Sequence, residues 1–266
     1  MELNDNIFRA NDIRGIAFED LTEEVVFALG KALGTESINR KQDDFIIGRD
    51  GRVSSPQLFE WLSGGVLSAG CNVLDIGIVP SPVFYHSTFN LNSSSGVVIT
   101  GSHNPADYNG FKILFNNNST SSEEIQSIKK RIKEQDFLSG TGNIESFDVV
   151  ESYVEEVTNN IKLKRPLNIS IDCGNGAAGV VAERIYKDLG CEVEGLFCDL
   201  NGKFPNHHPD PSRPENVEDL IKSVLKNNSD IGLAFDGDAD RLGVISPSGE
   251  MIFPDMQMIL FSEHIL

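Results

Sequence analysis

Short runs of β-branched residues alternate with longer helical patterns along this chain, and this alternation limits the fold more than any other feature. The stretch 54–70 has Pro56 near its start and Gly70 at its end, as helices do. Strands that alternate with helices predict βαβ units and a mostly parallel sheet, hence an α/β fold. Three runs around that helix are short and apolar enough to be buried strands, namely 44–48, 72–77 and 96–100.

The same pattern occurs a second time further along the chain. Cys191 follows a helical stretch just as Cys71 does 120 residues earlier, and Asp172 follows Asp50 by 122 residues. This nearly constant spacing predicts two copies of one α/β unit. The expected elements of the second copy are strands at 167–172, 191–197 and 230–236, with a helix at 178–190.

We expect three parts along the chain: 1–145, 146–248 and 249–266. The polar, glycine-rich stretch 139–146 follows an amphipathic helical pattern at 121–138 and marks the first boundary. The helix expected at 256–266 has apolar residues and no later strand to pack on, so the third part is expected to be only the start of a domain. A fragment and a natural short form both fit this pattern.

Charge and cysteine usage exclude several classes of partner. The 22 basic and 40 acidic residues give a net charge of −18, which argues against nucleic acid and anionic membranes. No apolar run approaches the ~18 residues that cross a bilayer, and no signal peptide is visible. The four cysteines form no C-x-x-C motif, so we expect buried free thiols at Cys71 and Cys191 and a cytoplasmic protein.

The segment T-G-S-H-N-P at 100–105 directly follows an expected strand. A serine at that place points into the crevice where α/β proteins bind ligands, and Gly101 would leave room for a close ligand. A plain turn explains the same residues without a ligand. A nucleophile elbow is excluded because Thr100 and Asn104 stand where that motif needs glycine. Lys112 brings a cation to the same region.

A second polar loop follows the expected strand 230–236, and it holds Asp236, Asp238, Asp240 and Arg241. In an extended chain its carboxylates would lie ~6.6 Å apart, so the loop must curl before they can share one Mg²⁺. Three carboxylates without a cation would repel one another. A solvated acidic turn is the alternative.

Two known acidic motifs resemble this loop and fail. An EF-hand would need Gly at Arg241 and Glu at Pro247. The motif of haloacid-dehalogenase-type phosphatases would need Thr or Val at Asp240, and it would make Asp236 a nucleophile.

Two further motifs have simple explanations. The literal G-x-G-x-x-G at 174–179, with Asp199 20 residues further on, matches a dinucleotide fingerprint, yet a tight strand-to-helix turn explains its glycines as well. His207 and His208 are adjacent, so in an extended loop they would point opposite ways and would not share a metal.

Together these segments resemble the α-D-phosphohexomutase superfamily, above all its bacterial bifunctional phosphomannomutase/phosphoglucomutases. The resemblance covers the whole chain and implies two similar α/β/α domains with mixed, mostly parallel sheets, plus the beginning of a third. The implied reaction interconverts hexose 6-phosphate and hexose 1-phosphate, of mannose or glucose, through a phosphoserine and a hexose 1,6-bisphosphate. The motifs that carry the resemblance occur in the same order at 8–15, 48–52, 100–112, 172–179, 203–216 and 232–241.

The resemblance also implies roles for single residues. Ser102 would carry the phosphoryl group, and His103, Lys112 and Arg14 are the other catalytic candidates. The implied partner is a small phosphorylated hexose, and the full-length form is expected to be a monomer. One Mg²⁺ per chain would be held by Asp236, Asp238, Asp240 and an oxygen of Ser102, and the substrate would be contacted by Asn11, Arg14, Lys112 and Arg241.

Three departures from the family pattern affect these expectations. Asn11 stands where the family usually has Tyr, which affects one expected substrate contact. Ala239 stands where Gly is usual, and we expect its methyl group to strain the acidic loop slightly. The family's third and fourth domains supply the sugar-recognition loop and the phosphate clamp, and only the first elements of the third are present. We therefore expect a mutase with poor activity on its own, the alternative being a non-catalytic remnant that binds Mg²⁺ and phosphosugar.

Overall fold

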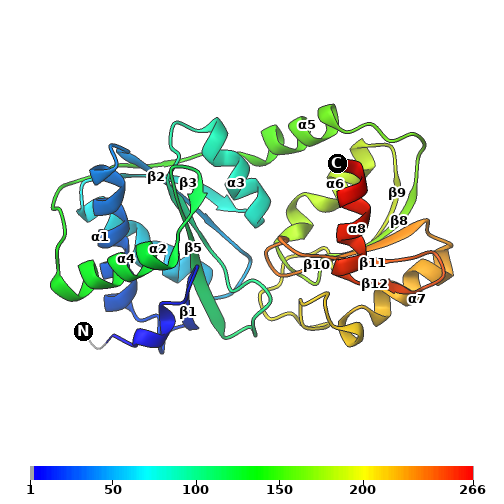
Figure 1. Ribbon diagram of the computed structural model, residues 1–266, viewed down its shortest axis with the longest axis horizontal. Coiled ribbons are helices and arrows are strands. Elements are labelled where there is room, and N and C mark those ends of the chain that lie inside the picture. The colour runs from blue at the N-terminus through cyan, green and yellow to red at the C-terminus, as the bar shows by residue number, and fades with distance from the viewer. Residues whose placement is uncertain (1–2, 266) are drawn as a thin grey trace. The chain divides into compact units, whose positions relative to one another are not determined.

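The chain divides into two compact α/β units, Met1–Val149 (unit 1) and Val150–Leu266 (unit 2) (Figure 1). The computed structural model describes residues 3–265 of the chain. No helix within those residues combines the length and the apolar character that a bilayer crossing requires. The expected division into 1–145, 146–248 and 249–266 stays a prediction.

Unit 1 is built on a seven-stranded mixed sheet with the order β1-β5-β4-β2-β3-β7, in which β6 pairs only with β5. The four neighbours β4, β2, β3 and β7 run parallel, whereas β5 is antiparallel to both β4 and β1. The strands are β1 (Ile13–Ile16), β2 (Asp44–Arg49), β3 (Asn72–Ile78), β4 (Gly96–Ile99), β5 (Tyr108–Phe115), β6 (Asn118–Ser119) and β7 (Ile144–Ser146).

Apolar side chains of the helices pack against apolar side chains of this sheet. A single core joins strand residues such as Phe45 and Ile47 to Leu29 and Leu62 of the helices. Helix α4 begins with a capping box between Ser121 and Glu124, and it ends earlier than expected because Gln135 is left-handed. The helices are η1 (Asp5–Ile7), α1 (Glu23–Asn39), α2 (Ser55–Ser68), α3 (Ser81–Asn90) and α4 (Ser122–Glu134).

Unit 2 is built on a five-stranded sheet with the order β12-β11-β10-β8-β9. Strands β9, β8 and β10 are parallel, and β11 and β12 continue the sheet antiparallel. The strands are β8 (Asn168–Asp172), β9 (Glu192–Leu196), β10 (Ile231–Phe235), β11 (Leu242–Ile245) and β12 (Met251–Ile252). The helices are α5 (Val150–Asn160), η2 (Ala177–Val180), α6 (Ala182–Asp188), η3 (Pro214–Asn216), α7 (Glu218–Asn227) and α8 (Pro254–Ile265).

The two sheets share one topology. In unit 1, β2 lies between β3 and β4, and β4 is followed by the antiparallel β5; in unit 2, β8, β9, β10 and β11 are arranged in the same way. The two expected copies of one α/β unit are therefore confirmed. The cysteines that suggested the repeat directly precede β3 and β9, and Cys71 and Cys191 are buried free thiols as predicted.

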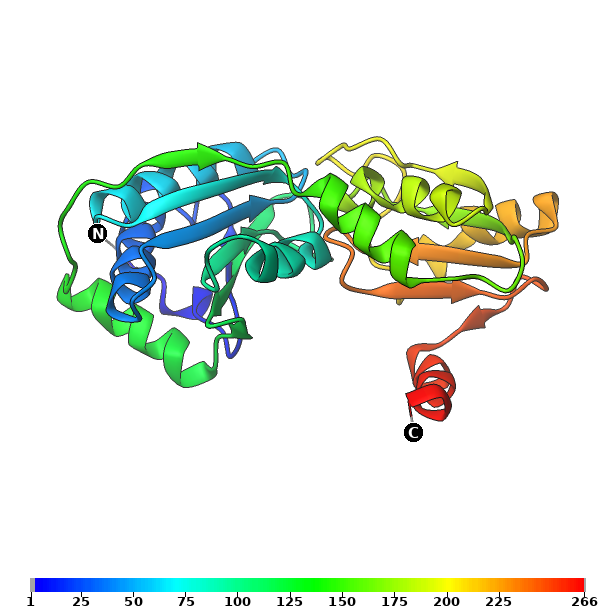
Figure 2. The same ribbon diagram turned by 90° about the horizontal axis from the view of Figure 1, so that it is seen from above.

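Two helices of unit 2 differ from their expected bounds. The helix expected over 178–190 covers only Ala182–Asp188, because Val181 leaves the helical region and separates it from the short turn η2. The helix expected at 256–266 begins at Pro254, and Leu266 lies outside the described residues. Figure 2 shows this helix, α8, extending from β12 away from the sheet.

Candidate active-site loops

Ser102 lies in the loop that joins β4 to β5, at the carboxyl end of a strand that is buried throughout. The serine is 2% exposed, and its φ of 48° is in the left-handed region that few non-glycine residues adopt. Its N–H donates to Thr100 Oγ1 at 2.8 Å, and its Oγ lies 3.3 Å from His103 Nδ1. The structure therefore brings these two predicted catalytic residues together.

Two cations predicted at the site lie on the strands beside this loop. Arg14 is on β1 opposite Gly110, is 6% exposed, and donates through Nη1 to the carbonyl of Gly101 at 3.3 Å. Its Nη2 is 2.6 Å from Asp12. Lys112 lies further along β5, opposite Val98 of β4. Asn11, the predicted substrate contact, is exposed in the turn that precedes β1.

Arg52, from another part of unit 1, contacts this loop and was not singled out from the sequence. It follows β2, its side chain is 0% exposed, and its Nε pairs with Asp50 at 3.2 Å. Asp50 in turn accepts the N–H of Gly101 at 3.2 Å. We call residues 100–108, which end at the first residue of β5, the serine loop. The remaining guanidinium N–H groups of Arg52 all donate to its backbone carbonyls, namely those of Ser102 (2.7 Å), Asn104 (2.7 Å), Pro105 and Tyr108 (2.9 Å).

The role expected for Gly101 is corrected by this arrangement. We expected its missing side chain to leave room for a ligand. A Cβ on Gly101 would instead lie 2.4 Å from the Cζ and Nε atoms of Arg52. The space is filled by the guanidinium, so glycine is needed because the arginine lies against the loop.

The acidic loop joins β10 to β11 in unit 2, which is the place that the serine loop occupies in unit 1. Asp236 and Asp238 are fully buried, Asp240 is exposed, and one ligand oxygen from each lies within 4.8 Å of the others. The Oδ1 atom of Asp236 accepts the N–H groups of Asp240 and Arg241, both at 3.0 Å, which closes the curl that we expected.

This loop fits a single Mg²⁺. Hard oxygen ligands at ~2.1 Å from an ion lie at most about 4.2 Å from one another, so the three oxygens need to contract only slightly. Buried carboxylates are stable as anions only beside a cation or hydrogen-bond donors. Ser102, the predicted fourth ligand, belongs to unit 1, and its place in the ligand set stays a prediction.

The glycine-rich loop at 174–179 supports the acidic loop directly. The N–H of Ala177 donates to the carbonyl of Gly237 at 2.9 Å, and a Cβ on Gly176 would lie 2.8 Å from that same oxygen. The backbone of the acidic loop therefore occupies the space over Gly176 that a dinucleotide pyrophosphate would need. Close packing, as well as the turn, explains the glycines.

His207 lies beside the same glycine-rich loop. Its Nε2 is 3.0 Å from Asp172 Oδ2, and its Nδ1 is 3.0 Å from the carbonyl oxygen of His208. Burial by itself lowers the pKa of His207, but the hydrogen bond and charge of Asp172 outweigh it, so the pKa lies above its usual value.

Comparison with known proteins identifies the family. Residues 5–139 match the model described as phosphoglucomutase/phosphomannomutase, alpha/beta/alpha domain I, and residues 151–249 match the corresponding domain II. The chain belongs to the phosphoglucomutase/phosphomannomutase family.

Named relatives agree with this membership. A phosphomannomutase/phosphoglucomutase of Pseudomonas putida is 46% identical over 99% of this chain, and a phosphoglucomutase of Neisseria meningitidis serogroup B is 45% identical over 98%. The chain spans 57% of the length of each. The crystal structure of a phosphoglucomutase/phosphomannomutase family protein from Burkholderia thailandensis matches with a TM-score of 0.96 and 44% identity, over 100% of this chain and 60% of that one.

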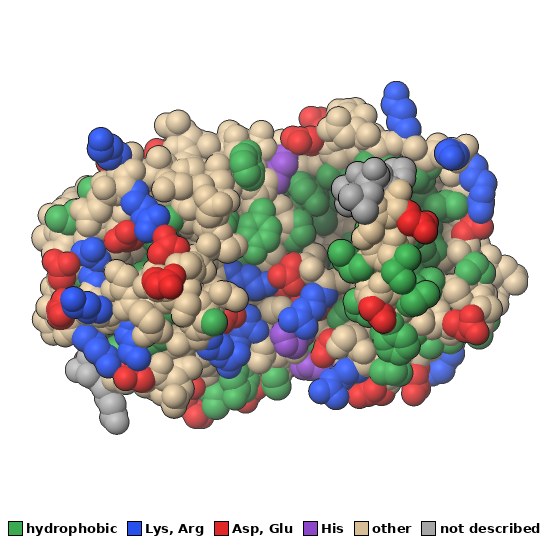
Figure 3. Space-filling model, viewed as in Figure 1, with side chains coloured by type: hydrophobic (Ala, Val, Ile, Leu, Met, Phe, Trp, Pro, Cys, Tyr) green, Lys and Arg blue, Asp and Glu red, His purple; other side chains and the backbone are tan. Residues whose placement is uncertain are grey.

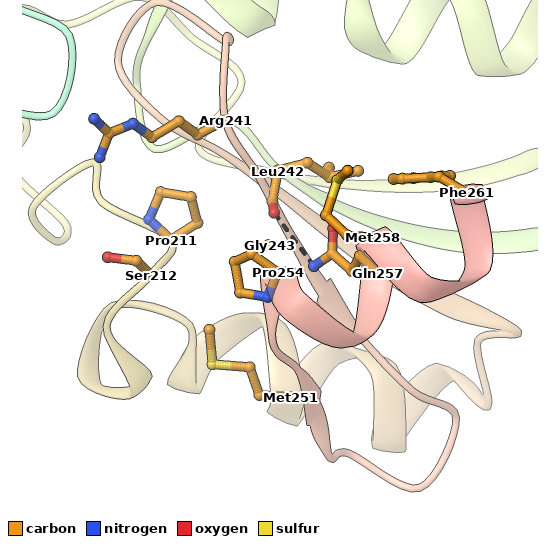
Figure 4. A pocket seen from close by; sticks show the side chains of 10 residues that line it. All are labelled: Pro211, Ser212, Arg241, Leu242, Gly243, Met251, Pro254, Gln257, Met258 and Phe261. Atoms are coloured by element: carbon orange, nitrogen blue, oxygen red, sulfur yellow. Dashed lines mark hydrogen bonds between the residues drawn. The ribbon is translucent and has the colours of Figure 1, made fainter.

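Helix α8 lies beyond the residues that the family models match. Its exposed residues include Met258, Leu260 and Phe261, and apolar side chains gather around it in Figure 3. Between α8 and the sheet lies a cavity of about 370 Å³, lined by Met258 and Phe261 among others. Figure 4 shows Arg241 at its edge, with the guanidinium directed away from α8, while Gln257 reaches the carbonyl of Leu242.

Proposed function

We propose that this chain performs the phosphoryl-transfer chemistry of a hexose phosphate mutase, with Ser102 as the group that accepts and returns the phosphoryl group. The substrate class is hexose 1-phosphate and hexose 6-phosphate, of mannose or glucose, and the intermediate is the hexose 1,6-bisphosphate. The observation that carries the proposal is that a chain of this family has two polar loops at equivalent positions of its two units. A buried, conformationally fixed serine and a curled triple-aspartate loop occupy the same position in two repeats.

The neighbours of Ser102 suit this chemistry. When Oγ attacks a phosphoryl group, the Oγ–P bond forms, the bond from phosphorus to the sugar oxygen breaks, and the serine proton must leave. His103 Nδ1, 3.3 Å from Oγ, is placed to accept that proton. Arg14 and Lys112 supply positive charge beside the same loop, and Arg14, Lys112, Asn11 and Arg241 are proposed to contact the substrate.

The acidic loop completes the proposal. Asp236, Asp238 and Asp240 would hold one Mg²⁺, with an oxygen on Ser102 as the proposed fourth ligand. A bound Mg²⁺ would supply the positive charge that phosphoryl transfer needs in a protein of net charge −18. We also propose that the protein is cytoplasmic and that its full-length form is a monomer.

Labelling of the serine tests the proposal. The chain is incubated with Mg²⁺ and glucose 1,6-bisphosphate carrying radioactive phosphate, and the labelled peptide is mapped. We expect label on Ser102, none in Ser102→Ala, and wild-type labelling in the control Ser119→Ala, an exposed serine of the same unit. Absence of label from Ser102 in the wild-type chain would contradict the proposed function.

A coupled assay of glucose 1-phosphate conversion measures the complete reaction. We expect turnover below ~1 per second, the lower end of the usual enzyme range. The chain spans only 57% of the length of its named relatives, and substrate positioning is worth a large part of the barrier. Mg²⁺ and sugar phosphate binding without any labelling of Ser102 would support the non-catalytic alternative.

A further inference from the structure

Arg52 occupies an unusual environment for a residue outside the predicted site. A guanidinium has five N–H donors, and in Arg52 each has a partner: one carboxylate and four carbonyls of the serine loop. The side chain is 0% exposed, so it cannot touch a substrate in solution. Arg52 can therefore affect phosphoryl transfer only through the conformation of the serine loop that it binds.

The four carbonyls belong to Ser102 itself and to residues that follow it in the loop. Ser102 has a φ of 48°, a conformation that persists in a non-glycine residue only where its surroundings fix it. The residue before it is fixed as well, because Asp50 accepts the N–H of Gly101 and also pairs with Arg52. The Arg52–Asp50 pair thus holds the serine from both sides.

We propose that Arg52 is a positioning residue for phosphoryl transfer, which aims the Ser102 hydroxyl by fixing the backbone of residues 101–108. The catalytic part of this proposal rests on the proposed function, because the orientation of the hydroxyl matters only if Ser102 takes up phosphate. The fixing of the loop does not rest on it. Lysine cannot replace Arg52, because an ammonium offers three donors without the planar fork that reaches four carbonyls.

Arg52→Lys tests the proposal, with Arg49→Lys as its matched control. Arg49 is the last residue of the same strand, β2, and is mostly buried. Its side chain pairs with Asp75 at 2.7 Å and not, within the described residues, with the serine loop. The single tryptophan, Trp61, lies in unit 1, so its fluorescence shows whether each variant is folded there. Hydrogen exchange of residues 100–108 then reports on the loop itself.

We expect Arg52→Lys to accelerate hydrogen exchange in residues 100–108 by about tenfold or more, and Arg49→Lys to leave it unchanged. The maximal rate of Ser102 phosphorylation by glucose 1,6-bisphosphate should fall by about 10²-fold in Arg52→Lys, with little change in the half-saturating concentration. A residue that only stabilised unit 1 would lower the unfolding temperature without this split.

Gly101→Ala provides a second route if Arg52→Lys does not fold. Its Cβ would press on the guanidinium from the loop side, and it should reproduce both effects with Arg52 still present. A folded Arg52→Lys protein with wild-type loop exchange would overturn the proposal, as would wild-type phosphorylation in that variant. If the wild-type chain takes up no phosphate at Ser102, the proposed function fails, and hydrogen exchange alone decides whether Arg52 holds the loop.

Discussion

Removing one charge from the acidic loop should change the free energy of unfolding in opposite directions with and without Mg²⁺. Asp236 and Asp238 are fully buried, and their ligand oxygens lie within 4.8 Å of each other. At an effective dielectric constant of ~20, two unit charges at that distance repel by about 3.5 kcal/mol. Asp238→Asn keeps the shape of the side chain and removes one charge. Because backbone N–H groups already offset part of the repulsion, we expect the metal-free variant to be more stable than the wild type by about 1–3 kcal/mol.

Mg²⁺ should reverse this order. A ligand that binds only the folded state stabilises it by about 2.7 kcal/mol at 100 times its dissociation constant. The wild type keeps three anionic ligands, whereas Asp238→Asn keeps two. Every tenfold loss of affinity in the variant removes about 1.4 kcal/mol of this stabilisation. At saturating Mg²⁺ the wild type should therefore unfold at the higher temperature.

Thermal unfolding with chelator and along a Mg²⁺ titration measures both effects. Far-UV circular dichroism reports on both units, whereas fluorescence of Trp61 reports on unit 1 and should be unaffected by the substitution. Glu194→Gln, at an exposed position of β9, removes one negative charge away from the loop and should show no crossover. The reasoning is refuted if Asp238→Asn is less stable than the wild type in chelator, or if Mg²⁺ does not change the order.

Three further predictions concern single residues. Ala239→Gly should raise the stability of unit 2 by up to about 1 kcal/mol. An L-residue at a φ of 59° costs ~1–2 kcal/mol, and the greater freedom of glycine in the unfolded chain offsets only part of the gain from removing this strain. A fall in the unfolding temperature would contradict the strain. The His207–Asp172 pair stabilises the folded state fully below the unfolded histidine pKa of ~6.5, and this stabilisation is lost as the pH rises through the raised folded pKa, so the stability advantage of the wild type over His207→Gln should shrink with rising pH. An advantage that stays constant in urea titrations from acid to alkaline pH would disprove this. Burial raises the pKa of the Cys71 thiol to about 12, so iodoacetamide should label this thiol only after denaturation. Rapid labelling of the native chain, detected by mass spectrometry, would refute its burial.

The positions of the two loops could be predicted from the sequence, because each loop directly follows a short apolar strand and is rich in polar side chains. The sequence did not allow Arg52 to be recognised, since four of the groups that it binds are backbone carbonyls, which every residue has. The space at Gly101 was misassigned for the same reason: sequence shows that a side chain is missing, not what fills the gap. Helix α1 was not predicted because its buried positions lie all around it and give no clear period.

Strands β1 and β5 show a similar limit. They place Arg14 beside the serine loop through an antiparallel pairing between residues about a hundred positions apart. Nothing in either short segment, read alone, indicates its partner.

The shared position of the two loops also determines what can be exchanged between relatives. In each unit the segment after one parallel strand, β2 or β8, touches the loop after the neighbouring strand, β4 or β10. Arg52 binds the serine loop, and Ala177 binds Gly237 of the acidic loop. A chimaera that transplants only the serine loop or only the acidic loop would place it on a foreign support. The smallest exchangeable module is therefore a pair of loops, and substitutions within a pair are expected to be inherited together.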